Sequence, residues 1–244
     1  MSDSPPVGFR FEIEKQPNDT TCGPTCLHAL YRYYGLEIPF TELEEGIPSL
    51  EEGGTLAVML GLDALRRGLA ATLYTFNLRF LDPSWFFPER IKNLEQKLAE
   101  QVEIHRGEKR NLAARHYLEF VQRGGDLRME DLTPELLIRY LSQDLPVITG
   151  LSSTWLYHSK REDPLTCAED DVRGHPAGHF VVLNGYDQSV AGVRIADPYE
   201  YSAEHGQSYT VPIMRLTNAV LLGILTYDAN LLIIHPKPEF LHAL

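Results

Sequence analysis

The sequence has little of what marks a secreted or membrane-bound protein. It contains only three cysteines among its 244 residues, and this small, odd number excludes a disulfide framework and suits a reducing compartment. Residues 1–8 include two prolines and no apolar segment, so we expect no signal peptide. No apolar run approaches the roughly 20 residues of a membrane-spanning helix. We therefore predict a cytoplasmic protein that does not bind a membrane.

Basic residues are also scarce. The chain has 22 Lys and Arg against 34 Asp and Glu, a formal net charge of −12, and the basic residues form no cluster. Phosphate backbones are bound mainly by clustered Lys and Arg, so we do not expect nucleic acid as a partner. The hydrophobic content of 43% is ordinary for a globular protein, and 244 residues suffice for one large domain with a substantial core.

The N-terminal part of the chain contains patterns of both strands and helices. Residues 9–13 alternate apolar and polar side chains, which predicts a half-buried strand. Cap-type residues at 18–21 precede a Gly-Pro pair and apolar residues at helical spacing, so Cys22 falls at or just inside a helix N-terminus. A second helix is predicted over 55–65 and a second strand over 70–76.

The middle of the chain has a mainly helical character. Apolar residues over 91–102 follow each other at three or four positions among charged residues, which predicts an amphipathic helix, continued or partnered by 112–121. A Thr-Pro-Glu sequence starts a further helix over 133–141. We interpret 83–142 as a helical insertion within a single domain that spans 1–244.

The C-terminal part reads mainly as strands, which are short apolar or alternating runs between turn residues. We predict them at 147–151, 180–183, 192–196 and 208–211, with a further pair at 219–234 around a turn that contains Asp228 and Asn230. The predicted fold class is therefore α+β. An N-terminal helical half carries a cysteine, and a C-terminal antiparallel sheet carries a histidine and an aspartate.

Four residues, in chain order Gln16, Cys22, His179 and Asp197, have the side chains that a cysteine acyl-transfer site needs. In such a site the thiolate attacks, an imidazole moves the proton, a carboxylate orients the imidazole and an amide donates to the oxyanion. The 18 positions from His179 to Asp197 suit a strand, a turn and a returning strand, so a hairpin would bring these two together. A helix N-terminus and a neighbouring imidazolium would both lower the pKa of Cys22.

Each of these residues also has a structural interpretation. Cys22 alone would be a small buried hydrophobe, as free cysteines often are. His179 alone would be a structural histidine at the start of a strand, and Asp197, before a proline, would be a turn residue. Asp187, which lies in a turn of its own, is the competing orienter of the imidazole and ranks second.

A zinc site is the other chemistry that these residue types allow. Its ligands would be drawn from Cys22, Cys26, His28, His175 and His179. The paired spacings of the common zinc motifs are absent, and a metal role for the cysteines would leave Gln16 without a purpose. We therefore predict no metal and no other cofactor.

Four short blocks surround the candidate residues: 16–27 (QPNDTTCGPTCL), the Tyr-Tyr-Gly of 33–35, 178–187 (GHFVVLNGYD) and 195–198 (IADP). Together they resemble the bacteriocin-processing, double-glycine leader peptidases, a family of papain-like cysteine peptidases. The segment 62–74 is similar to the one that lies between those blocks in the family. The middle of the chain, 83–142, has no matching counterpart.

The resemblance implies a papain-like fold with Cys22 as nucleophile, His179 as general base and acid, and Asp197 as orienter. It also implies an oxyanion hole made by Gln16 and the backbone N–H of Cys22. Family members are often fused to a membrane transporter, and they usually have an acidic residue before the cysteine, where this chain has Thr21. The chain therefore resembles stand-alone soluble members more closely, and cleavage after two glycines is not expected to carry over.

We predict a thiol-dependent hydrolase that acts on a peptide or amide bond through a Cys-His-Asp triad and an acyl-enzyme. Transfer of the acyl group to an amine uses the same acyl-enzyme and is an alternative, as is a non-catalytic peptide-binding module with a papain-like shell. The expected partner is a peptide or peptide-like small substrate, and the sequence does not indicate an oligomeric state. The helical insertion would form one wall of the cleft or a surface for a partner.

Overall fold

A single mixed sheet runs through the described part of the computed structural model, which comprises residues 7–50, 54–105, 110–164, 166–200, 206–226 and 229–237. Its eight described strands are β1 (Val7–Gly8), β2 (Ala70–Thr75), β3 (Asp126–Arg128), β4 (Val147–Ser152), β5 (Gly178–Asp187), β6 (Gly192–Ala196), β7 (Ser208–Pro212) and β8 (Asn230–His235). The strand order is β3-β2-β8-β4-β5-β6-β7, and β1 pairs with β5. Only β2 and β3 pair in parallel among the described strands, so the sheet is antiparallel around β5 and β6, as expected.

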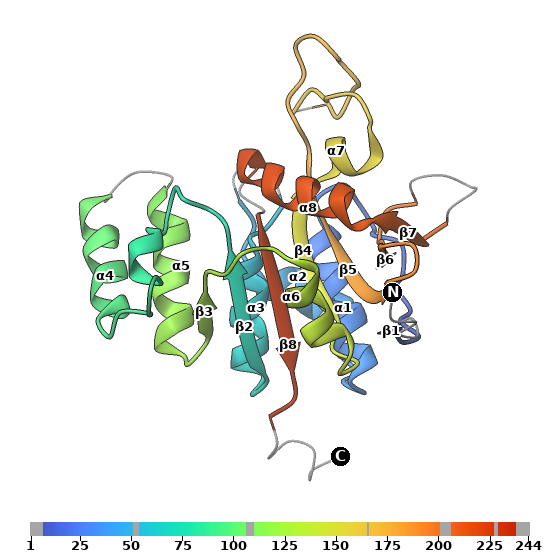
Figure 1. The fold of residues 1–244 in the computed structure, drawn as a ribbon. Coiled ribbons are helices and arrows are strands. Elements are labelled where there is room, and N and C mark those ends of the chain that lie inside the picture. Colours follow the sequence, from blue (N-terminus) through green and yellow to red (C-terminus); the bar gives the residue numbers. More distant parts are fainter. Residues whose placement is uncertain are drawn as a thin grey trace.

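Helices cover both faces of this sheet (Figure 1). They are α1 (Cys22–Tyr33), α2 (Phe40–Gly46), α3 (Ala57–Arg66), η1 (Pro83–Trp85), α4 (Leu94–Ile104), α5 (Arg110–Gln122), α6 (Pro134–Leu141), α7 (Ser153–Tyr157), α8 (Ile213–Leu222) and η2 (Gly223–Thr226). Buried residues of α1, α3 and α5 share one hydrophobic core, and buried residues of α6, α7 and α8 share the other. The α+β prediction is confirmed, including the helix that begins at Cys22.

Strand β5 is covered on both faces, which explains its continuous apolar run. Phe180 and Val182 belong to the core under α1 and α3, while Val181 and Leu183 belong to the core under α6 and α8. Successive side chains of a strand point to opposite faces, so a strand between two helical layers needs apolar residues at every position. This central placement holds the N-terminal end of β5, where His179 lies, in a fixed position.

The strand predicted over 9–13 is wrong, because the strand at this end of the described chain is β1, at Val7–Gly8. Only Val7 and Gly8 form ladder pairs with β5, and the backbone N–H of Phe9 makes one further bond to the carbonyl of Asn184. The alternation itself persists, because Phe11 is buried while its neighbours Arg10 and Glu12 are exposed. The apolar side chains pack against a helix instead of a strand: the rings of Phe9 and Phe11 lie 5.3 and 5.5 Å from that of Tyr33 in α1.

The strand pair predicted over 219–234 is also wrong in its first half. Residues 219–222 belong to α8, η2 follows, and only β8 is a strand. An apolar run of this length cannot be distinguished from a buried helix by its composition. The helical period is visible once the run is extended backwards, because the buried positions of α8 are Ile213, Leu216, Ala219 and Val220. Asp228 of the predicted turn lies outside the described residues, as do residues 1–6 of the segment expected not to be a signal peptide.

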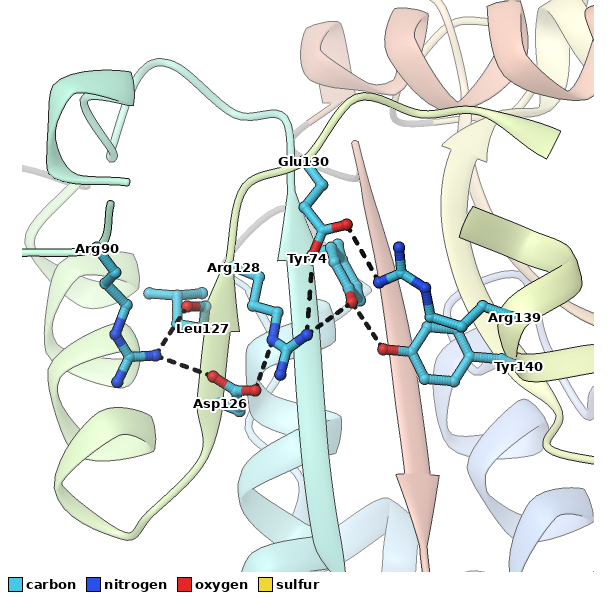
Figure 2. A network of polar contacts seen from close by, with 8 residues as sticks. All are labelled: Tyr74, Arg90, Asp126, Leu127, Arg128, Glu130, Arg139 and Tyr140. Carbon is cyan, nitrogen blue, oxygen red and sulfur yellow. Dashed lines mark hydrogen bonds and ion pairs between the residues drawn. The ribbon is translucent and has the colours of Figure 1, made fainter. Parts of the chain in front are cut away.

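The segment 83–142 is mainly helical, as predicted, but it also contributes to the sheet. Strand β3 pairs in parallel with β2, and α5 packs on α3. Figure 2 shows a polar network at this edge, in which Arg128 of β3 reaches the hydroxyl of Tyr74 in β2 and Tyr74 contacts the hydroxyl of Tyr140 in α6. These contacts connect the segment to β2.

Within the described ranges, none of the helices is both long enough and apolar enough to cross a membrane.

Candidate active site

Cys22 is the first residue of α1, and Asn18 builds the turn that precedes it. The side-chain oxygen of Asn18 accepts hydrogen bonds from the backbone N–H and the hydroxyl of Thr20, at 3.0 and 2.8 Å. The carbonyl of Asn18 accepts from the N–H of Thr21. The helix therefore starts abruptly at Cys22, and the N–H groups of its first turn lack intrahelical partners. The partial positive charge at this helix end favours a thiolate over a thiol.

Gly23 allows the N-terminus of α1 to approach β5 closely. A Cβ atom at this position would lie 2.6 Å from the Cγ2 atom of Thr55 and 3.3 Å from the ring of Phe180. Phe180 follows His179 in β5, so the close approach at Gly23 holds Cys22 beside the imidazole. A side chain at position 23 would force a shift against Thr55 and would crowd the ring of Phe180.

His179 lies between Cys22 and Asp197. Its side chain is buried, its Nε2–H donates to Oδ1 of Asp197 at 2.8 Å, and its ring lies close enough to the side chain of Cys22 for the two groups to shift each other's pKa. Because Nε2 faces the carboxylate, Nδ1 is the ring nitrogen left for the sulfur. The predicted hairpin is the geometry observed: β5 and β6 are antiparallel neighbours, and Asp197 directly follows β6.

Asp197 is fully buried and receives four hydrogen bonds. Oδ1 accepts from His179 and from the backbone N–H of Tyr199 at 2.8 Å, and Oδ2 accepts from the hydroxyls of Tyr157, at 2.6 Å, and Tyr209. Four donors occupy all the favourable acceptor positions of a carboxylate. The carboxylate is therefore fixed in orientation as well as in position.

The local charges shift the pKa values of all three side chains. Burial alone would raise the pKa of Cys22 and lower that of His179, because it disfavours the charged forms. The hydrogen bond and charge of His179 outweigh burial at the thiol and lower the pKa of Cys22. The charge and hydrogen bond of Asp197, with a further contribution from Cys22, raise the pKa of His179 to about 10.

The pKa of Asp197 is also set by burial on one side and by charge and hydrogen bonds on the other. Burial would raise its pKa, but the charge of His179 and the hydrogen bonds from His179, Tyr157 and Tyr209 outweigh this and lower it. The combined result favours a thiolate at Cys22, an imidazolium at His179 and a carboxylate at Asp197. Such an arrangement can deliver a nucleophile and a proton to the same substrate.

Gln16 lies beside the residues that directly follow Asp197. Its backbone N–H donates to the carbonyl of Pro198 at 2.9 Å, and its Nε2 donates to the carbonyl of Asn18 at 2.9 Å. Its Oε1 is buried and has no hydrogen-bond partner among the described residues. The structure thus brings Gln16 to the turn before Cys22 and to the residue after Asp197.

Asp187, the competing orienter, lies far from this cluster. It is the last residue of β5, eight positions beyond His179, which corresponds to roughly 26 Å along a strand at roughly 3.3 Å per residue. Its Oδ1 accepts hydrogen bonds from the backbone N–H and the hydroxyl of Ser189. Asp187 therefore caps the β5–β6 turn.

The alternative zinc ligands do not converge. A ring nitrogen of His28 contacts the carbonyl of Ile38, and the Sγ atom of Cys26 donates to the carbonyl of Phe180. In the described ranges no group of three or more His, Cys, Asp or Glu residues is placed to hold a metal ion. Burial, with the charges of Cys22 and Asp197, raises the pKa of Cys26 well above its ordinary value, so Cys26 is a protonated core thiol.

Sequence reasoning did not find the two tyrosines that contact Asp197. Tyr157 ends α7, 40 positions before the aspartate, and Tyr209 lies in β7, opposite Ile195 of β6. The signal that could have found Tyr209 is the register of β6 and β7, which the sequence pattern does not specify. Tyr157 carries no comparable signal.

The chain matches a known protein family over most of its length. The model of the Peptidase_C39 like family matches residues 9–219. No curated protein matches the chain.

Three solved structures are similar to the chain at low identity. One is a double glycine motif protease from an AMS/PCAT transporter in complex with the leader peptide, at 14% identity and a TM-score of 0.46, covering 95% of this chain and 98% of that one. The second is a C39-like peptidase from Bacillus anthracis, at 14% identity and 0.49, covering 96% and 99%. The third is xylellain, a cysteine protease from Xylella fastidiosa, at 15% identity and 0.44, covering 96% and 87%.

The family assignment rests on the family model, which extends from before Gln16 to beyond Asp197 and includes both ends of the candidate site. It agrees with the resemblance that the sequence blocks carry. The chain belongs to the C39-like peptidase family, a family of cysteine peptidases.

Proposed function

We propose that this protein is a thiol-dependent hydrolase that cleaves a peptide or amide bond through Cys22, His179 and Asp197. The observation that carries the proposal is the buried imidazole of His179, which is hydrogen-bonded to Asp197 and interacts electrostatically with the thiol of Cys22. Membership in a cysteine peptidase family supports a peptide as the class of substrate.

Acylation begins with the thiolate of Cys22. It attacks the carbonyl carbon of the substrate, and the electron pair of the C=O bond moves onto oxygen. The oxyanion accepts hydrogen bonds from the backbone N–H of Cys22 and from the Gln16 amide, whose nitrogen has a second N–H besides the one bonded to Asn18. As the intermediate collapses, the C–N bond breaks and His179 donates its proton to the leaving amine. The products are a thioester and a neutral amine.

Deacylation reverses the proton's direction. Neutral His179 accepts a proton from water while the water oxygen attacks the thioester carbon. When the C=O bond re-forms, the sulfur leaves as a thiolate, and the thiolate–imidazolium pair is restored beside a free acid. Asp197 stays ionised throughout and holds the imidazole in one orientation, which is the role of the carboxylate in such triads.

We also propose that the protein acts in the cytoplasm and that 83–142 is a helical addition to a single peptidase domain. Cys22, Cys26 and Cys167 are all free thiols, which suits a reducing compartment and a reactive thiolate. The addition packs through α5 on α3 and through β3 on β2, at the sheet edge remote from β6.

The test compares two cysteines of the same helix. We expect Cys22→Ala to abolish cleavage of a proteome-derived peptide library, read by mass spectrometry of new peptide ends, while its circular dichroism spectrum and melting temperature stay close to wild type. Cys26→Ala, one helical turn away and also buried, is the matched control and should retain cleavage within about tenfold, since it removes a core contact and a hydrogen bond to the carbonyl of Phe180 but no group of the proposed triad. Full cleavage by Cys22→Ala would refute the proposed function.

A further inference from the structure

The carboxylate of Asp197 has an asymmetric set of partners. Its Oδ1 atom accepts from the imidazole of His179 and the backbone N–H of Tyr199, whereas its Oδ2 atom accepts, within the described part of the chain, only from phenol hydroxyls, those of Tyr157 and Tyr209. A buried carboxylate is costly unless it is paired or fully hydrogen-bonded. Here two phenol hydroxyls supply half of the four hydrogen bonds.

The two tyrosines reach Asp197 from different elements. Tyr157 comes from the end of α7, and Tyr209 comes from β7, the edge strand beside β6. The ring of Tyr157 also lies 6.1 Å from the ring of His179 and 6.1 Å from that of Tyr199. Tyr157 therefore contacts both the carboxylate and the imidazole, so its position bears on the geometry of the pair.

The neutrality of these donors has a chemical consequence. An arginine on Oδ2 would satisfy the same oxygen but would cancel the negative charge that His179 experiences. Phenols donate without adding a charge, and burial with the charge of Asp197 keeps the pKa of Tyr157 raised, so it remains a protonated donor. Among the described residues, the imidazole of His179 is then the cation that balances the buried carboxylate.

We propose that Tyr157 and Tyr209 are positioning residues that keep Asp197 ionised and aimed at His179, so that the thiolate–imidazolium pair persists into acidic solution. This inference rests on the proposed function, because it assigns the tyrosines a role in the same site. Among the described residues, the titratable groups that face Asp197 are His179 from β5, the two tyrosines from α7 and β7, and the Cys26 thiol from α1. None of the groups other than His179 brings a positive charge.

The direction in which the pH profile of Cys22 shifts follows from the protonation state of the Asp197 carboxylate. Without a phenol hydroxyl on Oδ2, burial dominates and Asp197 accepts a proton at higher pH. A protonated Asp197 no longer stabilises the positive charge of His179. The thiolate of Cys22 therefore loses its counterion. The acid edge, which is the pH below which Cys22 loses its thiolate reactivity, should therefore rise when either hydroxyl is removed.

The experiment measures the rate of iodoacetamide alkylation at Cys22 between pH 3 and pH 9, resolved by mass spectrometry, in wild type, Tyr157→Phe, Tyr209→Phe and the double variant. We expect the midpoint of the acid edge to rise by about one pH unit in each single variant and further in the double variant, since a hydrogen bond to a charged group shifts a pKa by about this amount. Near pH 8 all four proteins should react at similar rates. A purely structural role would lower the rate equally at every pH.

Tyr31→Phe is the matched control. The hydroxyl of Tyr31 donates to the buried Asp63 at 2.7 Å, so this variant also removes a phenol–carboxylate bond, but one remote from Asp197. It should leave the acid edge unchanged. Each single variant is sufficient by itself, so that a failure of one to fold leaves the other as the test.

Two outcomes would overturn the inference, and they differ from each other. Superimposable profiles in wild type, Tyr157→Phe and Tyr209→Phe, with reactivity persisting below pH 7, would refute the role of the tyrosines and leave the proposed function standing. A wild-type profile that rises only near pH 8.5, as for an ordinary thiol, would refute both.

Discussion

Two buried or half-buried carboxylate clusters lie towards opposite edges of the same sheet, and they are balanced in different ways. At the β3 edge, Asp126 pairs with Arg90 at 2.9 Å and with Arg128 at 2.6 Å, and Glu130 pairs with Arg139 at 3.2 Å (Figure 2). Near the β7 edge, Asp197 has His179 as its cationic partner, at 2.8 Å, and two phenols.

The two clusters differ in the cation that pairs with the carboxylate, and this difference decides whether the cluster can transfer a proton. Arginine stays charged at every physiological pH, so the cluster at β3 binds elements together without exchanging protons. Imidazole gains or loses its proton within the range that proteins experience, so the same electrostatic pairing at Asp197 makes a group that can transfer a proton. Exposure strengthens the contrast, because the side chain of Asp126 is 34% exposed and that of Asp197 is 0% exposed.

The largest expected effect follows from removing the charge of the buried carboxylate. Asp197→Asn keeps the shape but removes the charge that raises the pKa of His179, so turnover should fall on the order of 10²–10⁴-fold, the usual contribution of general acid–base catalysis. Asp187→Asn, at the far end of β5, should change turnover by less than about twofold. Steady-state kinetics on any peptide that the wild type cleaves would measure both, and the reverse order would reassign the orienter to Asp187.

A smaller effect is expected at the arginine-balanced cluster. Asp126→Asn should lower the free energy of unfolding by about 1 kcal/mol or less, because half-exposed ion pairs contribute little to stability. Urea unfolding would measure this change. Cys22 alkylation should keep the wild-type pH profile, and a shifted profile would show that the two clusters are coupled and do not act independently.

Much of the candidate site could be anticipated because its signals are local. Cap-type residues, Gly-Pro and a helical period predict that Cys22 starts a helix, and all of these lie within a few positions of one another. The approach of His179 to Asp197 was expected from a single hairpin, whose two strands and turn are contiguous in the chain. The catalytic roles of these residues stay predictions.

The features that could not be anticipated depend on tertiary neighbours. Residues 9–13 alternate correctly, but their partner is a helix, which the alternation does not specify. Strand β3 has three residues, too few to show a period, although it brings the helical segment into the sheet. The contacts of Tyr157 and Tyr209 with Asp197 depend on where α7 and β7 lie, and neither placement is encoded near the aspartate.

The ionisation of Cys22 is the central claim, and one measurement tests it most directly. It is the pH dependence of iodoacetamide alkylation at Cys22, resolved by mass spectrometry, in wild type and in His179→Ala. Because the pKa of Cys22 is lowered by His179, the wild-type rate should stay high well below pH 7, and it should collapse there in the variant. A wild-type rate that rises only near pH 8.5, and is unchanged in His179→Ala, would identify an ordinary thiol and contradict the account.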